Sequence, residues 1–422
     1  MKIAVFGPGA GAHFISQRLV EEENVEQVYF VGANLAIQPT NKLVPLDIQL
    51  PEVLEFLDNT KIDLIVLLSI NHLLNKRLQN KIKEKGIPSC SPTTDLAMLE
   101  WSKVQGKELL TKLEIPTPTS RKISRDDLIE EFLNIPRPWV LKFDKDWRAG
   151  LQTIIITDEN VEKEFNDLKT YGDKRFLIYM GDFVNQQFSI EEFMIGKREY
   201  SYHTLCGEDS WVYLGSARDY KRFYEGDVGF NTAGMGSYSP VDINPKVHEY
   251  ADKILSHLKS IGTPYTGILY LGIMEDVNGE PYVLEINARP GDPEILSILL
   301  TIDDTVSLSK ILYQAATGQP IDPIVHNNKH SVSLRIVNSK YEESIKSTAL
   351  QDWNSIEPHC NPHLWPEMPD MYINLNQIRR IINSVVTVSA ETRHDASGKL
   401  YKFLHNLEMY NFRYRTDIGY LE

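Results

Sequence analysis

Mainly apolar segments alternate with amphipathic segments over residues 1–102. Lys2–Phe6, Gln27–Val31 and residues 63–70 are apolar runs of strand length, and a helical pattern follows the first and the last of them. Buried strands that alternate with helices are typical of a parallel sheet covered by helices. We therefore expect an α/β domain at the N-terminus.

Beyond residue 102 the pattern becomes a mixture of strands and helices. The helical segment that follows residue 102 ends at Pro116 and Pro118, and two prolines so close together indicate a boundary. Strand-like runs then recur, with occasional helices, through residues 103–325, which is an α+β pattern. Residues 326–422 contain further strand-like runs such as "SVSLRIV" and "INSVVTVS", enough for a small β-rich domain. The fold class expected is a multidomain chain that combines α/β and α+β architecture.

Composition and charge narrow the possible functions. Of the 422 residues 42% are hydrophobic and 24% are charged, and the formal net charge is −14. This acidic balance argues against sequence-independent binding of nucleic acid, which needs clustered lysine and arginine. No apolar run approaches the ~18 residues that span a bilayer. Three widely spaced cysteines, Cys90, Cys206 and Cys360, fit no zinc or disulfide pattern, so we expect a cytoplasmic protein.

The strongest chemical signal is the segment "YVLEINARPGDPE". Glu285 and Asn287 stand two residues apart on an expected strand, so both side chains project from one face. A carboxylate and an amide oxygen suit magnesium, which completes its shell with water and phosphates. Arg289 follows on the same alternation and can stabilise charge on a transferred phosphoryl group. A strand that ends in a salt-bridged turn is the structural alternative, and Asp292 and Glu294 fit equally well as caps of the following helix.

A second feature is the glycine-rich segment "DYKRFYEGDVGFNTAGMGSYSP". Its glycines, Gly234 among them, permit positive φ and close backbone approach. Lys221 supplies a cation and Asn231 a short polar group. Main-chain N–H donors beside cations are what a phosphate or carboxylate site needs, so we expect a loop that closes over the reaction intermediate. The alternative is a long surface hairpin.

Two further signals concern a nucleotide. In "SIEEFMIGKREYS" an apolar strand with Glu191, Glu192 and Phe193 turns at a glycine and resumes at Glu199. Such a hinge can present backbone groups to an adenine edge and a carboxylate to the ribose, although strand–glycine–strand with acids is also a common hairpin. Lys142 lies inside the apolar run "WVLKF", and pairing with ATP phosphates is one reason for a lysine there.

The N-terminal glycines of "FGPGAGAH" fit a dinucleotide fingerprint only in part. Strand, glycines and helix are present, but the next strand ends without an acidic residue for a ribose. We interpret the glycines as a tight turn at the mouth of a substrate cleft and His13 as a packing residue. A nicotinamide-dependent dehydrogenase is disfavoured for the same reason.

Together these features resemble the phosphoribosylamine–glycine ligase family of purine synthesis. The resemblance covers almost the whole chain in order, through "GIPSCSPT", "SKVQGKELLTKLEIPTPT", "IEEFMIGKREYS", the glycine-rich segment, "YTGILYLGIM", "LEINARPGDPE" and "YRTDIG". It implies an ATP-grasp fold with a Rossmann-like domain over residues 1–102, an ATP-grasp domain over residues 103–325 and a β-rich domain over residues 326–422. A lid over about residues 121–192 would belong to the ATP-grasp domain.

The resemblance also implies a reaction and roles for single residues. ATP phosphorylates a carboxylate, an amine then displaces phosphate, and ADP and phosphate are released. Glu285 and Asn287 are implied to hold Mg²⁺ or Mn²⁺, Lys142 to contact phosphate and Glu199 to lie near the ribose. Arg289 is then placed to stabilise the acyl-phosphate, and no side-chain nucleophile is required.

The chain departs from the family's pattern at several points. The segment "FDKDWRAGLQTI" replaces a glycine-rich lid loop, and Lys145 and Arg148 in it could substitute as phosphate contacts. Gly11 and Ala12 stand where the family has Arg-Glu, and "SINHLL" replaces a Gly-Pro-Glu turn. The nucleotide end is thus largely kept and the end for phosphoribosylamine is altered, so we hypothesise that the ligase chemistry persists with a changed amine.

The leading prediction is an ADP-forming carboxylate–amine ligase that uses ATP and Mg²⁺ (or Mn²⁺). We expect it to act on small molecules as a monomer or dimer and to bind neither nucleic acid nor membrane. Three alternatives stay open: the purine enzyme with a divergent acceptor site, a paralogous ligase of secondary metabolism with another substrate pair, and a non-catalytic nucleotide-binding homologue.

Overall fold

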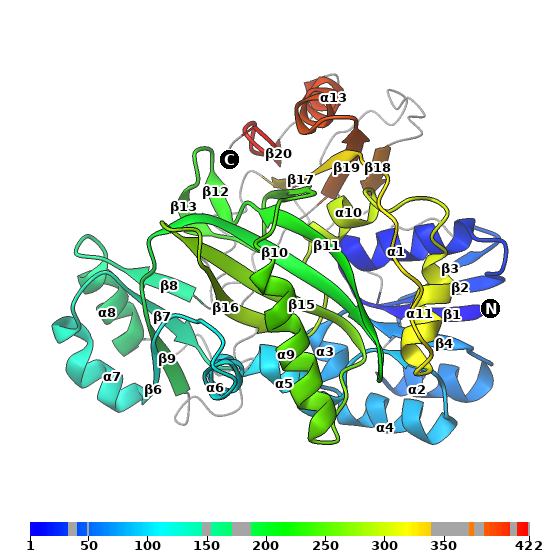
Figure 1. Ribbon diagram of the computed structural model, residues 1–422, viewed down its shortest axis with the longest axis horizontal. Helices are drawn as coiled ribbons and strands as arrows, with labels where there is room; N and C mark the ends of the chain where they lie inside the picture. The colour runs from blue at the N-terminus through cyan, green and yellow to red at the C-terminus, as the bar shows by residue number, and fades with distance from the viewer. Residues whose placement is uncertain are drawn as a thin grey trace.

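A computed structural model of the chain, shown in Figure 1, assembles into an N-terminal domain, a lid and a large central sheet. It describes residues 1–32, 40–48, 50–145, 153–170, 187–338, 371–374, 384–405 and 412–420. No helix in these ranges is long and apolar enough to cross a membrane.

The N-terminal domain is an open parallel sheet, as the alternating pattern predicts. Its strand order is β3-β2-β1-β4-β5, with β1 (Lys2–Phe6), β2 (Gln27–Val31), β3 (Leu43–Leu46), β4 (Leu64–Leu67) and β5 (Ser89–Cys90). The helices of this domain are α1 (Ala10–Glu21), α2 (Leu50–Asn59), α3 (Ile70–Leu73) and α4 (Lys76–Lys85). Strand β4 is shorter than the apolar run 63–70 because Ser69 is the N-cap of α3. The turns that follow β1 and β4 lie at the carboxyl edge of the sheet, the usual place for a ligand.

Two short helices lead from this domain to the lid. These are α5 (Thr94–Trp101) and α6 (Lys103–Lys112). Ser102 is the N-cap of α6 and accepts a hydrogen bond from Gln105 N at 3.2 Å. The same hydroxyl donates to Asp144 Oδ1 at 2.9 Å, and Val104 N donates to that oxygen at 3.2 Å. Asp144 therefore ties the end of a lid strand to the start of α6.

The lid is a four-stranded antiparallel sheet with its own apolar core. Its strand order is β6-β9-β7-β8, with β6 (Ser120–Ser124), β7 (Trp139–Phe143), β8 (Thr153–Ile156) and β9 (Gln187–Glu192). The helical elements beside it are α7 (Arg125–Glu131), η1 (Phe132–Asn134) and α8 (Val161–Thr170). Phe132, Trp139 and Phe188 are fully buried between them. The sequence also predicts a strand at "RFLIYM" (residues 175–180), and this segment lies outside the described residues.

The central sheet runs from the lid side to the C-terminal segment. Its order is β16-β15-β10-β11-β14-β17-β19-β18, and β20 pairs with β17. The strands are β10 (Gly196–Cys206), β11 (Trp211–Asp219), β14 (Gly236–Ser239), β15 (Gly267–Asp276), β16 (Pro281–Asn287), β17 (His330–Asn338), β18 (Met371–Asn374), β19 (Ser384–Ala390) and β20 (Phe412–Arg413). The helices that pack against it are α9 (Lys246–Ser260), α10 (Glu294–Leu299), α11 (Leu308–Ala316) and α13 (Arg393–His405). The C-terminal strands thus extend the central sheet through the pairing of β14 with β17.

The glycine-rich segment is a hairpin followed by a sheet strand, not an open loop. The hairpin consists of β12 (Arg222–Tyr224) and β13 (Val228–Asn231), joined by a turn in which Gly226 and Asp227 have φ of 72° and 54°. Arg415 of the C-terminal "YRTDIG" motif is fully buried and bonds to Asp227 Oδ1 at 2.7 Å. Asp417 in turn accepts from Gly226 N at 2.8 Å. The C-terminal motif therefore fixes the tip of the hairpin.

Candidate active site

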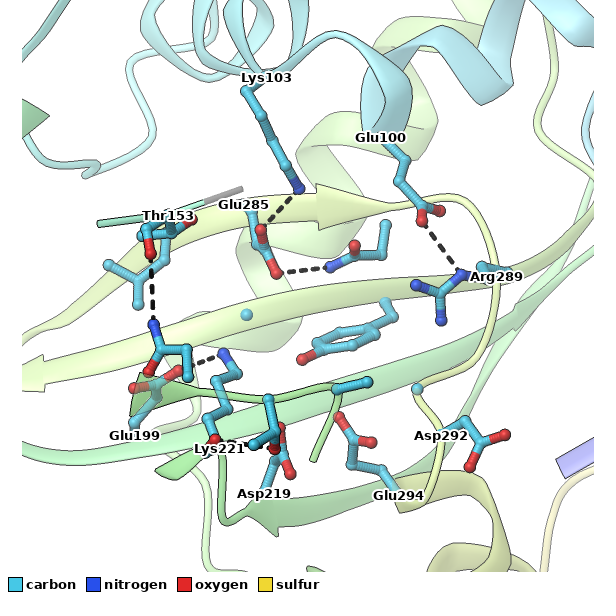
Figure 2. A pocket seen from close by; sticks show the side chains of 18 of the residues that line it. Glu100, Lys103, Thr153, Glu199, Asp219, Lys221, Glu285, Arg289, Asp292 and Glu294 are labelled. Atoms are coloured by element: carbon cyan, nitrogen blue, oxygen red, sulfur yellow. Dashed lines mark hydrogen bonds and ion pairs between the residues drawn. The ribbon is translucent and has the colours of Figure 1, made fainter. Parts of the chain in front are cut away.

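A cavity of about 970 Å³ lies where the N-terminal domain, the lid and the central sheet meet. The turns after β1 and β4, the three lid strands β7, β8 and β9, strands β15 and β16 and the β12–β13 hairpin all contribute to its wall. The sequence-predicted residues that line it are Lys142, Glu191, Glu192, Phe193, Glu199, Lys221, Asn231, Glu285, Asn287 and Arg289. Figure 2 shows many of the charged side chains that face this space.

Glu285 and Asn287 project from the same face of β16. Asn287 Nδ2 donates to Glu285 Oε1 at 3.2 Å, and Lys103 Nζ lies 2.7 Å from Glu285 Oε2 (Figure 2). Burial opposes ionisation of this carboxyl, but the ammonium groups of Lys103, Lys221 and Lys142 hold its pKa well below the usual range. Within the described ranges no three His, Cys, Asp or Glu side chains are grouped to hold a metal by themselves. An ionised carboxylate beside an amide fits an ion such as Mg²⁺, which takes its other ligands from phosphates and water.

Lys142 and Lys107 share one carboxylate oxygen. Lys142 Nζ, on lid strand β7, lies 2.9 Å from Glu191 Oε2, and Lys107 Nζ, on α6, lies 3.1 Å from the same oxygen. Burial, together with the charge of Lys142, lowers the pKa of Lys107 to about 8. Lys142 lines the cavity and Lys107 does not. Because Lys107 neutralises Glu191 from behind, Lys142 can turn to a phosphate without leaving a buried carboxylate unpaired.

The segment between β9 and β10 borders an apolar part of the cavity. Its lining consists of Val140, Ile155, Phe193, Met194, Met274 and Leu284. Apolar walls with a few polar groups at the edge suit an aromatic base. Glu192 and Glu199 stand at that edge, and Glu199 Oε1 lies 2.6 Å from Lys221 Nζ (Figure 2). We call this region, with Lys103, Lys142, Glu191 and Glu285, the nucleotide end.

The β12–β13 hairpin forms a wall of the cavity beside the lid. Asn231 Nδ2 donates to the carbonyl oxygen of Thr153 on lid strand β8 at 3.5 Å, so the hairpin and the lid meet here. Thr232 Oγ1 donates to Lys221 O at 3.0 Å and accepts from Gly234 N at 3.0 Å. Gly234 has φ of +98°, and a Cβ there would lie 2.8 Å from Asp219 Oδ1. Gly234 supports this wall without lining the cavity.

Arg289 stands between the nucleotide end and the turn that precedes α10. Its Nε lies 3.1 Å from Glu100 Oε1, and Glu100 Oε2 accepts from Ala288 N at 2.8 Å (Figure 2). The carboxylate of Glu100 raises the pKa of Arg289 further, so the guanidinium stays charged. Arg289 is therefore held at Nε by Glu100 and at Nη1 by the carbonyl oxygen of Pro290, which accepts at 3.1 Å, and it lines the cavity.

A second group of charged residues lies beyond Arg289, beside the N-terminus of α1. It consists of Asp219, Asp292, Glu294 and Arg335, and we call it the acidic end. Burial, followed by the charge of Glu294, raises the pKa of Asp219 well above its usual range, and burial also raises the pKa of Glu294. Asp292 accepts from Gly11 N at 3.4 Å and lies 2.9 Å from Arg335 Nη2. The N-terminal domain, the turn before α10 and the C-terminal segment meet at this point.

Two residues that the sequence suggests as phosphate contacts, Lys145 and Arg148, are not found in the cavity wall of the described residues. The side chain of Lys145 is exposed and is not part of the cavity wall, and its backbone N–H donates to Trp101 O at 3.0 Å. Arg148 lies outside the described residues. His13 is buried with its ring 5.7 Å from that of Phe30, and burial lowers its pKa to about 4, which is typical of a packing residue.

Sequence reasoning missed several residues that the fold brings to the site. Lys103 and Lys107 stand four residues apart at the start of α6, so both fall on one helix face, a signal that was available. Glu100 and Asp219 had no local signal, because their partners come from distant segments. Arg335 was also missed, since its contact with Asp292 spans 43 residues.

Comparison with known proteins agrees with this geometry. Residues 1–100 match the family model for the phosphoribosylglycinamide synthetase N domain, and residues 101–295 match that for its ATP-grasp (A) domain. A phosphoribosylamine–glycine ligase of Leptospira interrogans is 30% identical, covering 100% of this chain and 98% of its own. One from Caldanaerobacter subterraneus is 34% identical over 71% of each chain.

A solved structure supports the same architecture. The crystal structure of a phosphoribosylamine–glycine ligase from Thermotoga maritima matches with a TM-score of 0.77 and 23% identity, over 99% of this chain and 100% of that one. At 23% identity this match supports the fold alone. The family assignment rests on the family models and on the two relatives in sequence. The chain belongs to the phosphoribosylamine–glycine ligase family and is an ADP-forming carbon–nitrogen ligase with the ATP-grasp fold.

Proposed function

We propose that the enzyme joins the carboxyl group of glycine to the amine of phosphoribosylamine at the expense of ATP, as its relatives are named for doing. The observation that carries this is the ionised Glu285, paired with Asn287 and facing Lys103, Lys142 and Lys221 across one cavity. Carboxylate and amide oxygens beside several ammonium groups suit a metal-bound polyphosphate.

In the first step a carboxylate oxygen of glycine attacks the γ-phosphorus of ATP, and the bond to the β-bridging oxygen breaks to release ADP. Mg²⁺ held by Glu285 and Asn287 would neutralise charge on the phosphates. Lys142 and Lys103 supply further positive charge at the nucleotide end, and the adenine lies against the apolar wall near Phe193. Arg289, fixed by Glu100, faces the charge that develops on the acyl-phosphate.

In the second step the amine nitrogen attacks the acyl carbon, the bond to the phosphate oxygen breaks, and the nitrogen loses a proton. The fixed β12–β13 hairpin and the lid enclose the intermediate, which water would otherwise hydrolyse. Since the hairpin tip is held by Arg415, we assign closure to the lid rather than to the glycine-rich segment. This replaces the expectation that the segment itself closes as a loop.

The test is release of ADP and phosphate from Mg-ATP with glycine, with and without phosphoribosylamine generated in place. Stimulation by both substrates supports the proposal. A protein that binds Mg-ATP but is not stimulated by this pair contradicts it, and then the hypothesis of a changed amine takes its place.

A further inference from the structure

Arg335 is a buried arginine with most of its hydrogen-bonding capacity unused. It lies on β17, where Ser331, Ser333 and Arg335 alternate with Val332 and Leu334. The valine and the leucine pack in the core beneath α13, so the other three point to the opposite face. Arg335 is 6% exposed and lines the cavity at the acidic end.

A single side-chain nitrogen of Arg335 accounts for all the bonds of its guanidinium to the described residues. Nη2 donates to Asp292 Oδ1 at 2.9 Å and to Asp292 O at 3.1 Å. Nε is buried and has no acceptor within the described ranges, and the same ranges offer none to Nη1. An arginine that served only to anchor the turn before α10 would be satisfied on its buried Nε edge as well.

The unpaired donors of a guanidinium have a defined chemical preference. Nε–H and the N–H groups of Nη1 point to different edges of the guanidinium plane, so each donates separately, and the N–H groups of Nη1 can bond to an oxygen of a carboxylate or a phosphate. The charge of Arg335 is permanent, so its unpaired donors select an anion rather than a neutral acceptor. Two carboxyls, Asp219 and Glu294, belong to the same acidic end as Arg335. Burial raises the pKa of both, which favours their neutral forms and so reduces the repulsion that a bound anion would meet.

We propose that Arg335 binds the anionic group, phosphate or carboxylate, of the amine that the enzyme ligates. This inference rests on the proposed ligase function, because the acidic end lies beyond Arg289, on the side of the acyl-phosphate away from the nucleotide. The amine reaches the acyl carbon past Asp219 and Glu294 while its anion is held by Arg335 and by the N-terminus of α1, where Gly11 N already faces a carboxylate.

The binding experiment uses the full chain and two stable anions as probes. Ribose 5-phosphate represents an acceptor with a phosphate, and malonate represents one with a carboxylate. We expect the wild-type protein to bind one of them by calorimetry, and Arg335→Met to weaken that binding by about 10- to 100-fold, the loss typical of a hydrogen bond to a charged group. Arg335→Lys, which keeps the charge but not the planar guanidinium with its separate donors, should fall in between.

A matched control is Arg198→Met. Arg198 also pairs with a carboxylate of the central sheet, Glu275, at 2.7 and 2.8 Å, but it does not line the cavity. It should leave anion binding unchanged. The proposal is overturned if wild type and Arg335→Met bind the anions equally well. It is also overturned if the wild-type protein binds neither anion.

Kinetics separate this inference from the function on which it rests. Arg335→Met should raise KM for the acceptor amine by about the same factor while KM for ATP stays constant. Glycine-dependent exchange of the β,γ-bridging oxygen of ATP, which needs no acceptor, should persist in the variant. If that exchange is absent even in wild type while Arg335-dependent anion binding is present, the proposed ligase function fails and the anion site stands.

Discussion

At the nucleotide end Glu285 and Glu191 each pair with lysines, whereas at the acidic end the charge of Glu294 acts on Asp219. This difference in charged neighbours accompanies pKa shifts in opposite directions at Glu285 and Asp219. Lysines hold the pKa of Glu285 well below the usual range despite its burial, while burial raises the pKa of Asp219 and Glu294. Both ends belong to one cavity of about 970 Å³, so the difference comes from charged neighbours rather than from depth.

This difference separates two tasks that a ligase must perform. The nucleotide end must be ionised before substrate arrives, because it balances a polyphosphate and a divalent ion. The acidic end must receive an amine and a leaving proton, for which carboxyls of raised pKa are suited. Arg289 stands between them, and in the proposed reaction the acyl group passes from one end to the other at that point.

The largest effect should come from Glu285→Gln, which removes the central negative charge of the nucleotide end. Glutamine keeps the shape and can still accept from Asn287, but it cannot balance Lys103 or hold a divalent ion as well. We expect ADP release to fall by roughly 10³-fold, the scale of losing one preorganised charged contact to the transferred group. Circular dichroism and cooperative unfolding should show that the fold persists.

Its matched control is Glu275→Gln on the neighbouring strand β15. Glu275 is buried, more so than Glu285, and accepts from Arg198 and Tyr200, but it lies outside the cavity wall. This variant should lose stability and keep turnover. Equal losses of turnover in the two variants would show that Glu285 acts through the fold rather than at the phosphates.

The next effect distinguishes the two lysines that share Glu191. Lys142→Met should lower kcat/KM for ATP by about 10²-fold, because it removes a cation from the cavity. Lys107→Met should lower Tm, since Thr117 Oγ1 and Glu191 Oε2 lose the ammonium that lies at 2.7 and 3.1 Å. It should lower kcat/KM for ATP by a smaller factor than Lys142→Met, because Lys142 remains but must then neutralise Glu191 alone. A larger kinetic loss in Lys107→Met would reverse the assignment of the two roles.

The parts that sequence reasoning reached are those with a short-range pattern. The alternation in "YVLEINAR" places Glu285 and Asn287 on one face, and the apolar run around Lys142 marks a buried strand. No local pattern predicts the hairpin in the glycine-rich segment or the pairing of β14 with β17. Both depend on partners far along the chain. The same holds for Arg335, whose neighbours on β17 form an ordinary alternating strand.

A third test compares the two ends by the pH dependence of stability. Glu285, whose folded pKa is lowered, stabilises the fold above its ordinary pKa of 4.5, and this contribution is lost as pH falls through the folded value. Asp219, whose folded pKa is raised, binds a proton more tightly in the folded state, so stability falls as pH rises above 3.8. The slope per titrating group is at most about 1.4 kcal/mol per pH unit.

Two variants should therefore show opposite trends in Tm relative to wild type. The cost of Glu285→Gln should shrink as pH falls below 4.5, and Asp219→Asn should gain stability over wild type as pH rises above 3.8. Parallel trends in the two variants would mean that both ends carry the same charge state, and the comparison would fail.

The smallest effect should come from Lys145→Ala, which tests how far the nucleotide end extends. The Lys145 side chain is exposed and outside the cavity wall, and its backbone N–H, which bonds to Trp101 O, is unaffected by the substitution. We expect kcat/KM for ATP to change less than about 2-fold, as for surface substitutions generally. A 10-fold loss would place Lys145 among the phosphate contacts, as the sequence pattern suggests, because an exposed lysine affects turnover to that extent only when the bound substrate recruits it. Lys142 and Lys103 would then not be the whole cationic set of this end.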